Sequence, residues 1–223
     1  MGKSSKDFAS SEKSSDSEPA ISLDLHHPDV QPAAQQLAKA FELSADIHLL
    51  DGRKISCSSY LSHVTTAAGL TLKAKGSVRA TLITILHDVV EEGGGVALQR
   101  LHQEFSPSIV SAVMQMTPPE SDKRLSWAKR KEQALLRMRL TDDRDVAMAF
   151  AADKAATLME LDLDCEQFGT LNVLCKLRGG CDELLWYYQG CWHALVSRLT
   201  PRMNHLLRLQ VDRLRSRINH FSD

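Results

Sequence analysis

The chain contains 223 residues, and its 27 Lys and Arg residues against 28 Asp and Glu residues give a formal net charge of −1. Apolar residues make up 43% of the chain and charged residues 25%, as in a soluble globular protein that can bury a core. The near-zero charge argues against a nucleic-acid partner, and the lack of a long apolar run argues against a membrane span or a signal peptide, so we expect a cytoplasmic protein.

Residues 1–20 form a segment of different composition from the rest. The segment is rich in Ser, mixes charges of both signs and contains one aromatic residue. Such a segment cannot bury enough apolar area to offset the entropy lost on ordering, so we predict a disordered N-terminal tail. The remaining residues, 21–223, are of the size of one domain, and we predict that they form one.

Apolar residues recur at helical spacing through most of residues 21–223, and no segment shows the alternation of a half-buried strand. The polar residues 51–59 interrupt this pattern as a loop. Ser77 is a candidate N-cap of a strongly apolar helix that Gly93–Gly95 would end. The Ala-rich residues 143–161 are typical of a central, buried helix. The sequence therefore predicts an all-α fold with helices over 32–41, 60–72, 77–92, 96–105, 107–116, 126–139, 143–161, 182–196 and 201–219.

The predicted helix 77–92 ends in four titratable residues, His87, Asp88, Glu91 and Glu92. Residues three and four apart share a face of a helix, so His87 would lie beside Glu91, and Asp88 beside Glu92. Polar groups that follow a buried segment are costly unless something satisfies them, which a divalent metal would do. Imidazole and carboxylate together suit Mn, Fe, Co, Ni or Zn better than Ca or Mg. A solvated helix end is the competing interpretation.

Two residues elsewhere favour the metal site. His63 lies on the preceding predicted helix, which an antiparallel hairpin would bring beside His87. Asp153 lies within the apolar segment AMAFAADKAATLMEL, and a carboxylate in a buried helix needs a cation or several donors. Together with His87 and Asp88, these residues supply two imidazoles and two carboxylates from three helices.

The order of these residues resembles that of the HD phosphohydrolase superfamily, and the surrounding segments resemble its RelA/SpoT hydrolase branch. YLSHVTTAAGL followed by TLITILHDVVEE is similar to that branch's Tyr-x-x-His…LLHDxxED stretch. FAADKAATLMEL is similar to its LADKLxNL stretch, and SWAKRKEQALLRM resembles a helix with an Arg-Lys pair in small relatives. The resemblance covers roughly residues 35–195. It implies an HD-domain helical bundle similar to a small alarmone hydrolase.

The resemblance also implies roles for single residues. One divalent ion, typically manganese in this branch, would be bound by His63, His87, Asp88 and Asp153. Glu91 would be the catalytic carboxylate that orients and deprotonates the attacking water, and Glu92 would assist it. The substrate-binding candidates are the basic residues Arg53, Lys54, Arg130, Lys131 and Lys154.

Members of this branch remove the 3′-pyrophosphate of guanosine tetra- or pentaphosphate (ppGpp), the alarmone of the stringent response, so the implied partner is a small nucleotide. The sequence departs from the branch at four places: Glu92 replaces Asp, Gly93 and Thr157 replace Thr and Asn, and Cys57–Tyr60 replaces Gly-x-Pro-Tyr. These departures leave open another substrate, such as NADPH, and a non-catalytic nucleotide-binding regulatory module. A homo-oligomer is also left open.

Overall fold

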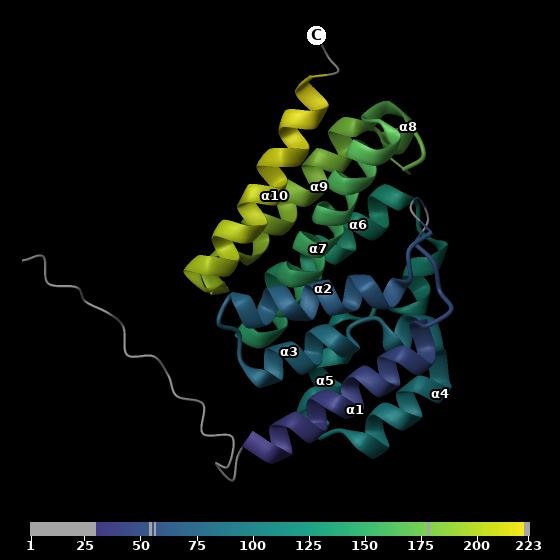
Figure 1. The fold of residues 1–223 in the computed structure, drawn as a ribbon, viewed down its shortest axis with the longest axis vertical. Coiled ribbons are helices and arrows are strands. Elements are labelled where there is room, and N and C mark those ends of the chain that lie inside the picture. Colours follow the sequence, from purple (N-terminus) through teal and green to yellow (C-terminus); the bar gives the residue numbers. More distant parts are fainter. Residues whose placement is uncertain (1–29, 54, 56, 178, 221–223) are drawn as a thin grey trace, which may run out of the picture.

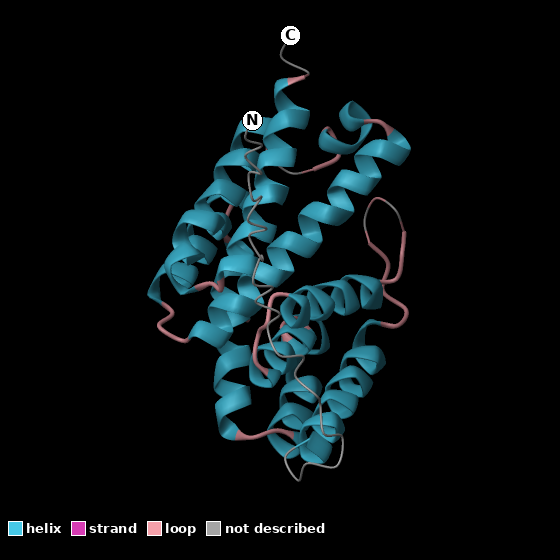
Figure 2. Ribbon diagram, turned by 60° about the vertical axis from the view of Figure 1, so that its left-hand side comes forward, coloured by secondary structure: helices cyan, strands magenta, loops and turns pink. Residues whose placement is uncertain are grey.

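A computed structural model of the chain describes residues 30–220 except 54, 56 and 178. The predicted tail, residues 1–20, lies outside the described residues. Within the described part the fold is all-α, as predicted, and the only β pairing there is a single bridge between Gly52 and Ser59 (Figure 2). The helices are α1 (Val30–His48), α2 (Tyr60–Lys73), α3 (Val78–Leu86), α4 (Val89–Glu104), α5 (Pro107–Met116), α6 (Trp127–Leu140), α7 (Arg144–Phe168), α8 (Thr170–Leu174), α9 (Cys181–Leu195) and α10 (Pro201–Asn219), with short 3₁₀ helices at Glu120–Arg124 and Val196–Arg198.

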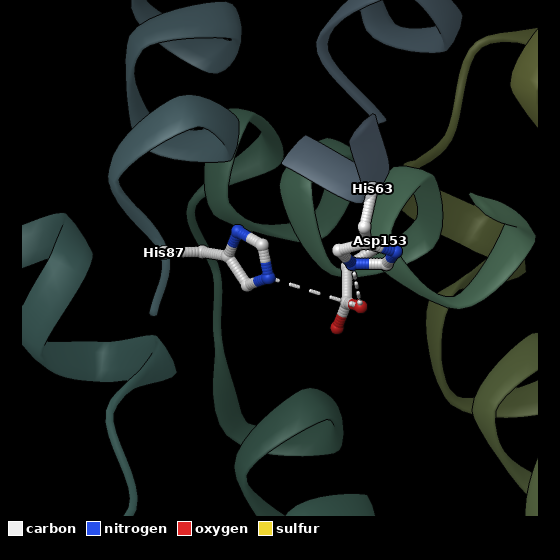
Figure 3. A group of neighbouring side chains, drawn as sticks. All are labelled: His63, His87 and Asp153. Carbon is white, nitrogen blue, oxygen red and sulfur yellow. Dashed lines mark ion pairs between the residues drawn. The ribbon is translucent and has the colours of Figure 1, made fainter. Parts of the chain in front are cut away.

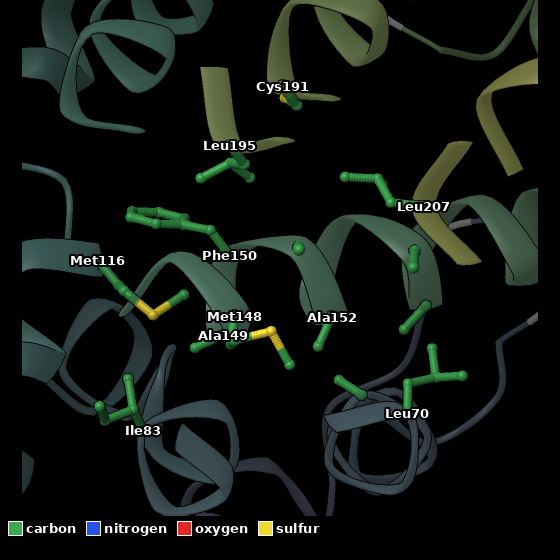
Figure 4. Packing of buried hydrophobic residues seen from close by; sticks show 14 of the residues in the cluster. Leu70, Ile83, Met116, Met148, Ala149, Phe150, Ala152, Cys191, Leu195 and Leu207 are labelled. Carbon is green, nitrogen blue, oxygen red and sulfur yellow. The ribbon is translucent and has the colours of Figure 1, made fainter. Parts of the chain in front are cut away.

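Helix α7 runs through the centre of the bundle, as its Ala-rich sequence predicts. It packs against α2 and α3 on one side and against α9 and α10 on the other (Figures 1 and 4). Its residues from Val146 to Asp153 are all buried. The small Ala side chains let neighbouring helices approach closely, while Met148 and Phe150 fill the space between them. A polar residue on α7 is therefore held rigidly, in contact with residues from several helices.

The predicted helix 77–92 is wrong in one respect, because the chain breaks at His87 and Asp88. Helix α3 ends at Leu86 and α4 begins at Val89. In an unbroken helix the carbonyl of Thr84 would accept the backbone N–H of Asp88. Here that carbonyl lies 2.7 Å from Nδ1 of His87, so a side chain competes for it and the helix ends. His87 and Glu91 therefore do not share a helical face.

The predicted helix stop at Gly93–Gly95 is also wrong. Helix α4 continues through these glycines to Glu104 and is kinked at Gly94, where φ is 58° and ψ is −142°. A positive φ favours glycine, so Gly94 absorbs the change of direction without a side-chain clash. The separately predicted helix 96–105 is the second half of α4.

The remaining predicted helices agree with the structure in position, and two of them extend further. Helix α1 continues past Phe41 to His48, and α7 continues past residue 161 to Phe168. The short helix α8 was not predicted. No helix among the described residues has the length and apolar character needed to cross a membrane.

Candidate metal centre

Three of the predicted metal ligands meet in the interior of the bundle. His63 comes from α2, His87 from the break after α3, and Asp153 from the middle of α7 (Figure 3). One ligand atom from each lies within 4.8 Å of the others. Oδ1 of Asp153 lies 3.3 Å from Nε2 of His63 and 3.8 Å from Nε2 of His87. The carboxylate therefore sits between the two imidazoles.

The orientation of His87 is set by the backbone behind it. Its Nδ1 lies 2.7 Å from the carbonyl oxygen of Thr84, which can only accept a hydrogen bond, so Nδ1 carries the proton. When the ring is neutral, Nε2 then presents its lone pair toward Asp153. This is the arrangement by which an outer hydrogen bond orients a metal-binding histidine.

His63 is held in the same way by a carboxylate. Its Nδ1 lies 3.1 Å from Oε1 of Glu160, which is also on α7. Nε2 of His63 and Nε2 of His87 are both buried and make no well-aligned hydrogen bond, although Asp153 Oδ1 lies 3.3 Å from the first and Asp88 Oδ2 lies 3.0 Å from the second. Two buried imidazole nitrogens that face carboxylate oxygens in this way form a donor set that fits a divalent transition metal.

Asp88, the fourth predicted ligand, adjoins this group through His87. Its Oδ2 lies 3.0 Å from Nε2 of His87 and accepts a hydrogen bond from the hydroxyl of Tyr60. Asp88 is the N-cap residue of α4, yet its side chain makes no capping bond to the helix. An Asp at that position commonly caps the helix, so its side chain is committed to the site instead.

The electrostatics of the group follow from burial and from close opposite charges. Burial alone would lower the pKa of His87, but the neighbouring Asp88 outweighs it and raises this pKa to about 9. Burial likewise opposes ionisation of Asp88, but His87 lowers its pKa to about 2. Asp153 is also held well below its ordinary pKa against burial, chiefly by Lys154 and then by His63. Both carboxylates are therefore ionised near neutral pH and are ready to bind a cation.

Glu91 and Glu92, the predicted catalytic carboxylates, are exposed residues in the first turn of α4, which begins directly after Asp88. Partial desolvation and the negative charges of Asp88 and Glu92 raise the pKa of Glu91. Glu91 thus lies three residues after the predicted ligand Asp88, with a carboxylate that is more basic than usual.

The predicted substrate-binding cations fall into two groups. Lys154 pairs with Oδ2 of Asp153, and Nη2 of Arg53 lies 2.7 Å from Oε2 of Glu160, so both are engaged with acidic residues around the centre. Lys131 lies on α6 with Nζ 4.4 Å from the ring centroid of Tyr187. Arg130 precedes Lys131 and is partly buried.

Burial and the positive charge of Lys154 lower the pKa of Lys131 to about 8. Lys54 lies outside the described residues.

Sequence reasoning missed Glu160 and His48. Glu160 follows Asp153 by two helical turns (160 − 153 = 7), a spacing that places both on one face, and this signal was available. His48 is fully buried, and its ring lies 4.9 Å from that of Tyr60. Its place at the end of α1 carried no signal, because the predicted helix stopped at Phe41.

The chain is similar in sequence to one protein family and in fold to several solved structures. A model of the HD domain family matches residues 40–167, which include all four predicted ligands. The structure is similar to lmo0812 from Listeria monocytogenes EGD-e, with a TM-score of 0.59 and 22% identity over 69% of this chain and 99% of that one. It is also similar to a metazoan ortholog of SpoT described as hydrolysing ppGpp, with a TM-score of 0.62 and 17% identity over 80% of this chain and 93% of that one. No curated protein matches the sequence.

Proposed function

The chain belongs to the HD domain family, and from this premise we propose that it is a divalent-metal-dependent phosphohydrolase of a phosphorylated nucleotide. The observation that carries the proposal is the buried group of His63, His87 and Asp153, whose ligand atoms converge and in which both Nε2 atoms face carboxylate oxygens. A module that only binds a nucleotide would have no need to keep such a set of metal-binding side chains in its interior.

The residues around the centre have distinct tasks in this proposal. His63, His87, Asp88 and Asp153 would hold one divalent ion, for which we propose manganese. When bound, such an ion lowers the pKa of water and polarises a phosphoryl oxygen. Glu91, whose pKa is raised by desolvation and by Asp88, orients the attacking water and accepts its proton.

The lysines beside the centre supply positive charge for an anionic substrate. Lys154 is fixed by Asp153, while Lys131 extends across the ring of Tyr187. Both are partly buried, and a charge-assisted hydrogen bond to phosphate is stronger in such surroundings than in water. We propose that they neutralise the phosphate groups of the substrate. Arg130 and Lys54 are proposed to help, and Glu92 to support Glu91.

For the substrate itself we propose guanosine tetraphosphate, cleaved at its 3′-pyrophosphate. Support comes from the motif resemblance to the RelA/SpoT branch and from the fold shared with the SpoT ortholog that hydrolyses ppGpp. One observation favours a second candidate, a different nucleotide such as NADPH. Arg53, a predicted nucleotide contact, is paired with Glu160 and is less available to a guanine nucleotide.

The test is hydrolysis of a nucleotide panel by manganese-loaded protein. The panel contains guanosine tetraphosphate, NADPH and deoxynucleotides, and released pyrophosphate or phosphate is measured. We expect pyrophosphate from guanosine tetraphosphate, and no turnover by the variants His87→Ala and Asp88→Ala. The exposed His102 on α4 provides a matched control, since His102→Ala removes an imidazole away from the centre.

Each outcome has a separate meaning. Turnover of another nucleotide alone would keep the phosphohydrolase and change its substrate. Stoichiometric metal binding without any turnover would contradict the proposed reaction and favour the regulatory module. Turnover that persists in His87→Ala would contradict the metal centre.

A further inference from the structure

Glu160 is an acidic side chain beside the metal centre to which neither the sequence nor the family resemblance gave a role. It lies on α7 two turns after Asp153, and its side chain is 20% exposed. Oε1 lies 3.1 Å from Nδ1 of His63 and Oε2 lies 2.7 Å from Nη2 of Arg53. Each carboxylate oxygen therefore has its own basic partner.

The contact with His63 fixes more than the position of the ring. An ionised carboxylate only accepts hydrogen bonds, so Nδ1 of His63 must carry the proton when the ring is neutral. The lone pair is then on Nε2, which faces Asp153 at 3.3 Å. Without Glu160 the ring would be free to adopt the other tautomer or to rotate, and in either case it would present no lone pair to the centre.

Arg53 holds Glu160 in this orientation. It belongs to the loop between α1 and α2, and its guanidinium lies 5.3 Å from the ring centroid of Tyr60. The hydroxyl of Tyr60 in turn donates to Asp88. A chain of contacts thus runs from Glu160 through Arg53 and Tyr60 to Asp88, while Glu160 contacts His63 directly.

We propose that Glu160 is a positioning residue that keeps Nε2 of His63 available to the divalent ion, with Arg53 as its counter-ion. The inference rests on the proposed function only for the presence of that ion. A carboxylate behind a metal-binding histidine changes metal affinity or activity by about 10- to 100-fold in other proteins. An effect of this size is large enough to measure by direct metal titration.

The experiment titrates metal-free protein with Mn²⁺ by calorimetry and compares four variants with the unaltered chain. Glu160→Ala removes the hydrogen bond and the charge, and we expect the dissociation constant for Mn²⁺ to rise about 10- to 100-fold. Glu160→Gln keeps an acceptor oxygen without the charge, so the dissociation constant for Mn²⁺ should rise less in this variant. The control Glu166→Gln makes the same change on the same helix at an exposed side chain that pairs with Arg217, and should leave the constant unchanged.

The fourth variant, Arg53→Met, distinguishes the effect of the hydrogen bond between Glu160 and His63 from the effect of the loop that carries Arg53. It removes the counter-ion but leaves Glu160 beside His63, so it should weaken metal binding less than Glu160→Ala does. An equal or larger effect would assign the loss to the loop and overturn the proposal. Far-UV circular dichroism of each variant shows whether it is folded.

A second readout reports the histidine itself. In zinc-loaded protein, the Nδ1 proton of His63 should give a protected NMR resonance that disappears in Glu160→Ala. A Glu160→Ala protein that is folded, binds Mn²⁺ with unchanged affinity and keeps this resonance would overturn the inference. Neither readout depends on turnover, so a failure of the proposed reaction is distinguishable from a failure of this inference.

Discussion

The two imidazoles of the centre are each fixed from behind by one acceptor, the Thr84 carbonyl for His87 and the Glu160 carboxylate for His63. Both rings therefore present Nε2 toward the same carboxylate, that of Asp153. At the scale of single residues, each imidazole of the centre turns Nε2 toward Asp153 and holds that orientation through a hydrogen bond from Nδ1 to an acceptor behind the ring. The residues outside this arrangement are the ones whose roles need kinetic tests.

Glu91 is the first of these residues. The variant Glu91→Gln removes the proton acceptor and keeps the size of the side chain, so we expect the rate constant kcat to fall by about 10²- to 10⁴-fold. Metal binding should stay unchanged, because Glu91 is not among the four ligands. Steady-state kinetics and metal content measured on the same sample check this. A kcat within twofold of the unaltered enzyme would remove Glu91 from the reaction.

Lys131 gives the proposed reaction a pH dependence. Its pKa is lowered to about 8 by burial and by Lys154, so its positive charge is present below pH 8 and is lost as the pH rises through that value. If Lys131 binds phosphate, kcat/KM should decline above about pH 8. Arginine does not titrate in this range, so Lys131→Arg should remove the decline. A decline that persists in Lys131→Arg would contradict the assignment.

The sequence predicted which residues meet better than it predicted their surroundings. Asp153 and His87 were singled out because polar groups in or after apolar segments need a partner, and His63 because it lies on the preceding predicted helix; the structure places the three together. His48 was missed because the predicted helix stopped at Phe41, whereas Glu160 was missed although its spacing of two helical turns from Asp153 was available. The engagement of Arg53 with Glu160 depends on a loop conformation that no periodicity encodes.

At the scale of elements, the break between α3 and α4 could not be predicted from the helical periodicity. The apolar run before it and the carboxylates after it both fit one helix, and the competing hydrogen bond from His87 to Thr84 is a property of one side chain. The break turns the Asp88 side chain toward His87 and leaves Glu91 on a separate helix. The site therefore depends on a local departure from regular structure.

The glycines of α4 give a test at this scale. A Cβ added at Gly93 would lie 2.7 Å from Cβ of Ala97 and 2.7 Å from Cδ1 of Ile47, whereas one added at Gly95 would meet no atom within 4 Å. Gly93→Ala should therefore lower the free energy of unfolding by about 1–3 kcal/mol through overpacking. Gly95→Ala should leave it unchanged or raise it by about 0.5–1 kcal/mol, because alanine favours the helix.

Urea unfolding of the two variants measures this difference directly, and each serves as the control of the other. Equal stabilities would show that α4 does not pack against α1 as the structure has it. A loss confined to Gly95→Ala would contradict the helical continuation through the glycines.

At the scale of the whole molecule, the proposed ligands come from α2, the α3–α4 break and α7, so an ion bound to them would link three parts of the bundle. A ligand that binds only the folded state stabilises it by about 2.7 kcal/mol at a hundredfold excess over its dissociation constant. We therefore expect Mn²⁺ to raise the melting temperature by roughly 5–10 °C in a domain of this size. A chelator should reverse the shift, and Asp153→Asn should show none. A shift of the same size in Asp153→Asn would place the ion elsewhere.

The most direct test of the metal centre is hydrolysis of guanosine tetraphosphate by chelator-stripped protein during a stepwise return of Mn²⁺. We expect no turnover in stripped protein, activity that rises until one equivalent of ion is bound, and none at any concentration in Asp153→Asn. Turnover without added ion, or an Asp153→Asn protein as active as the unaltered chain, would contradict the claim that His63, His87, Asp88 and Asp153 form the metal centre of a phosphohydrolase.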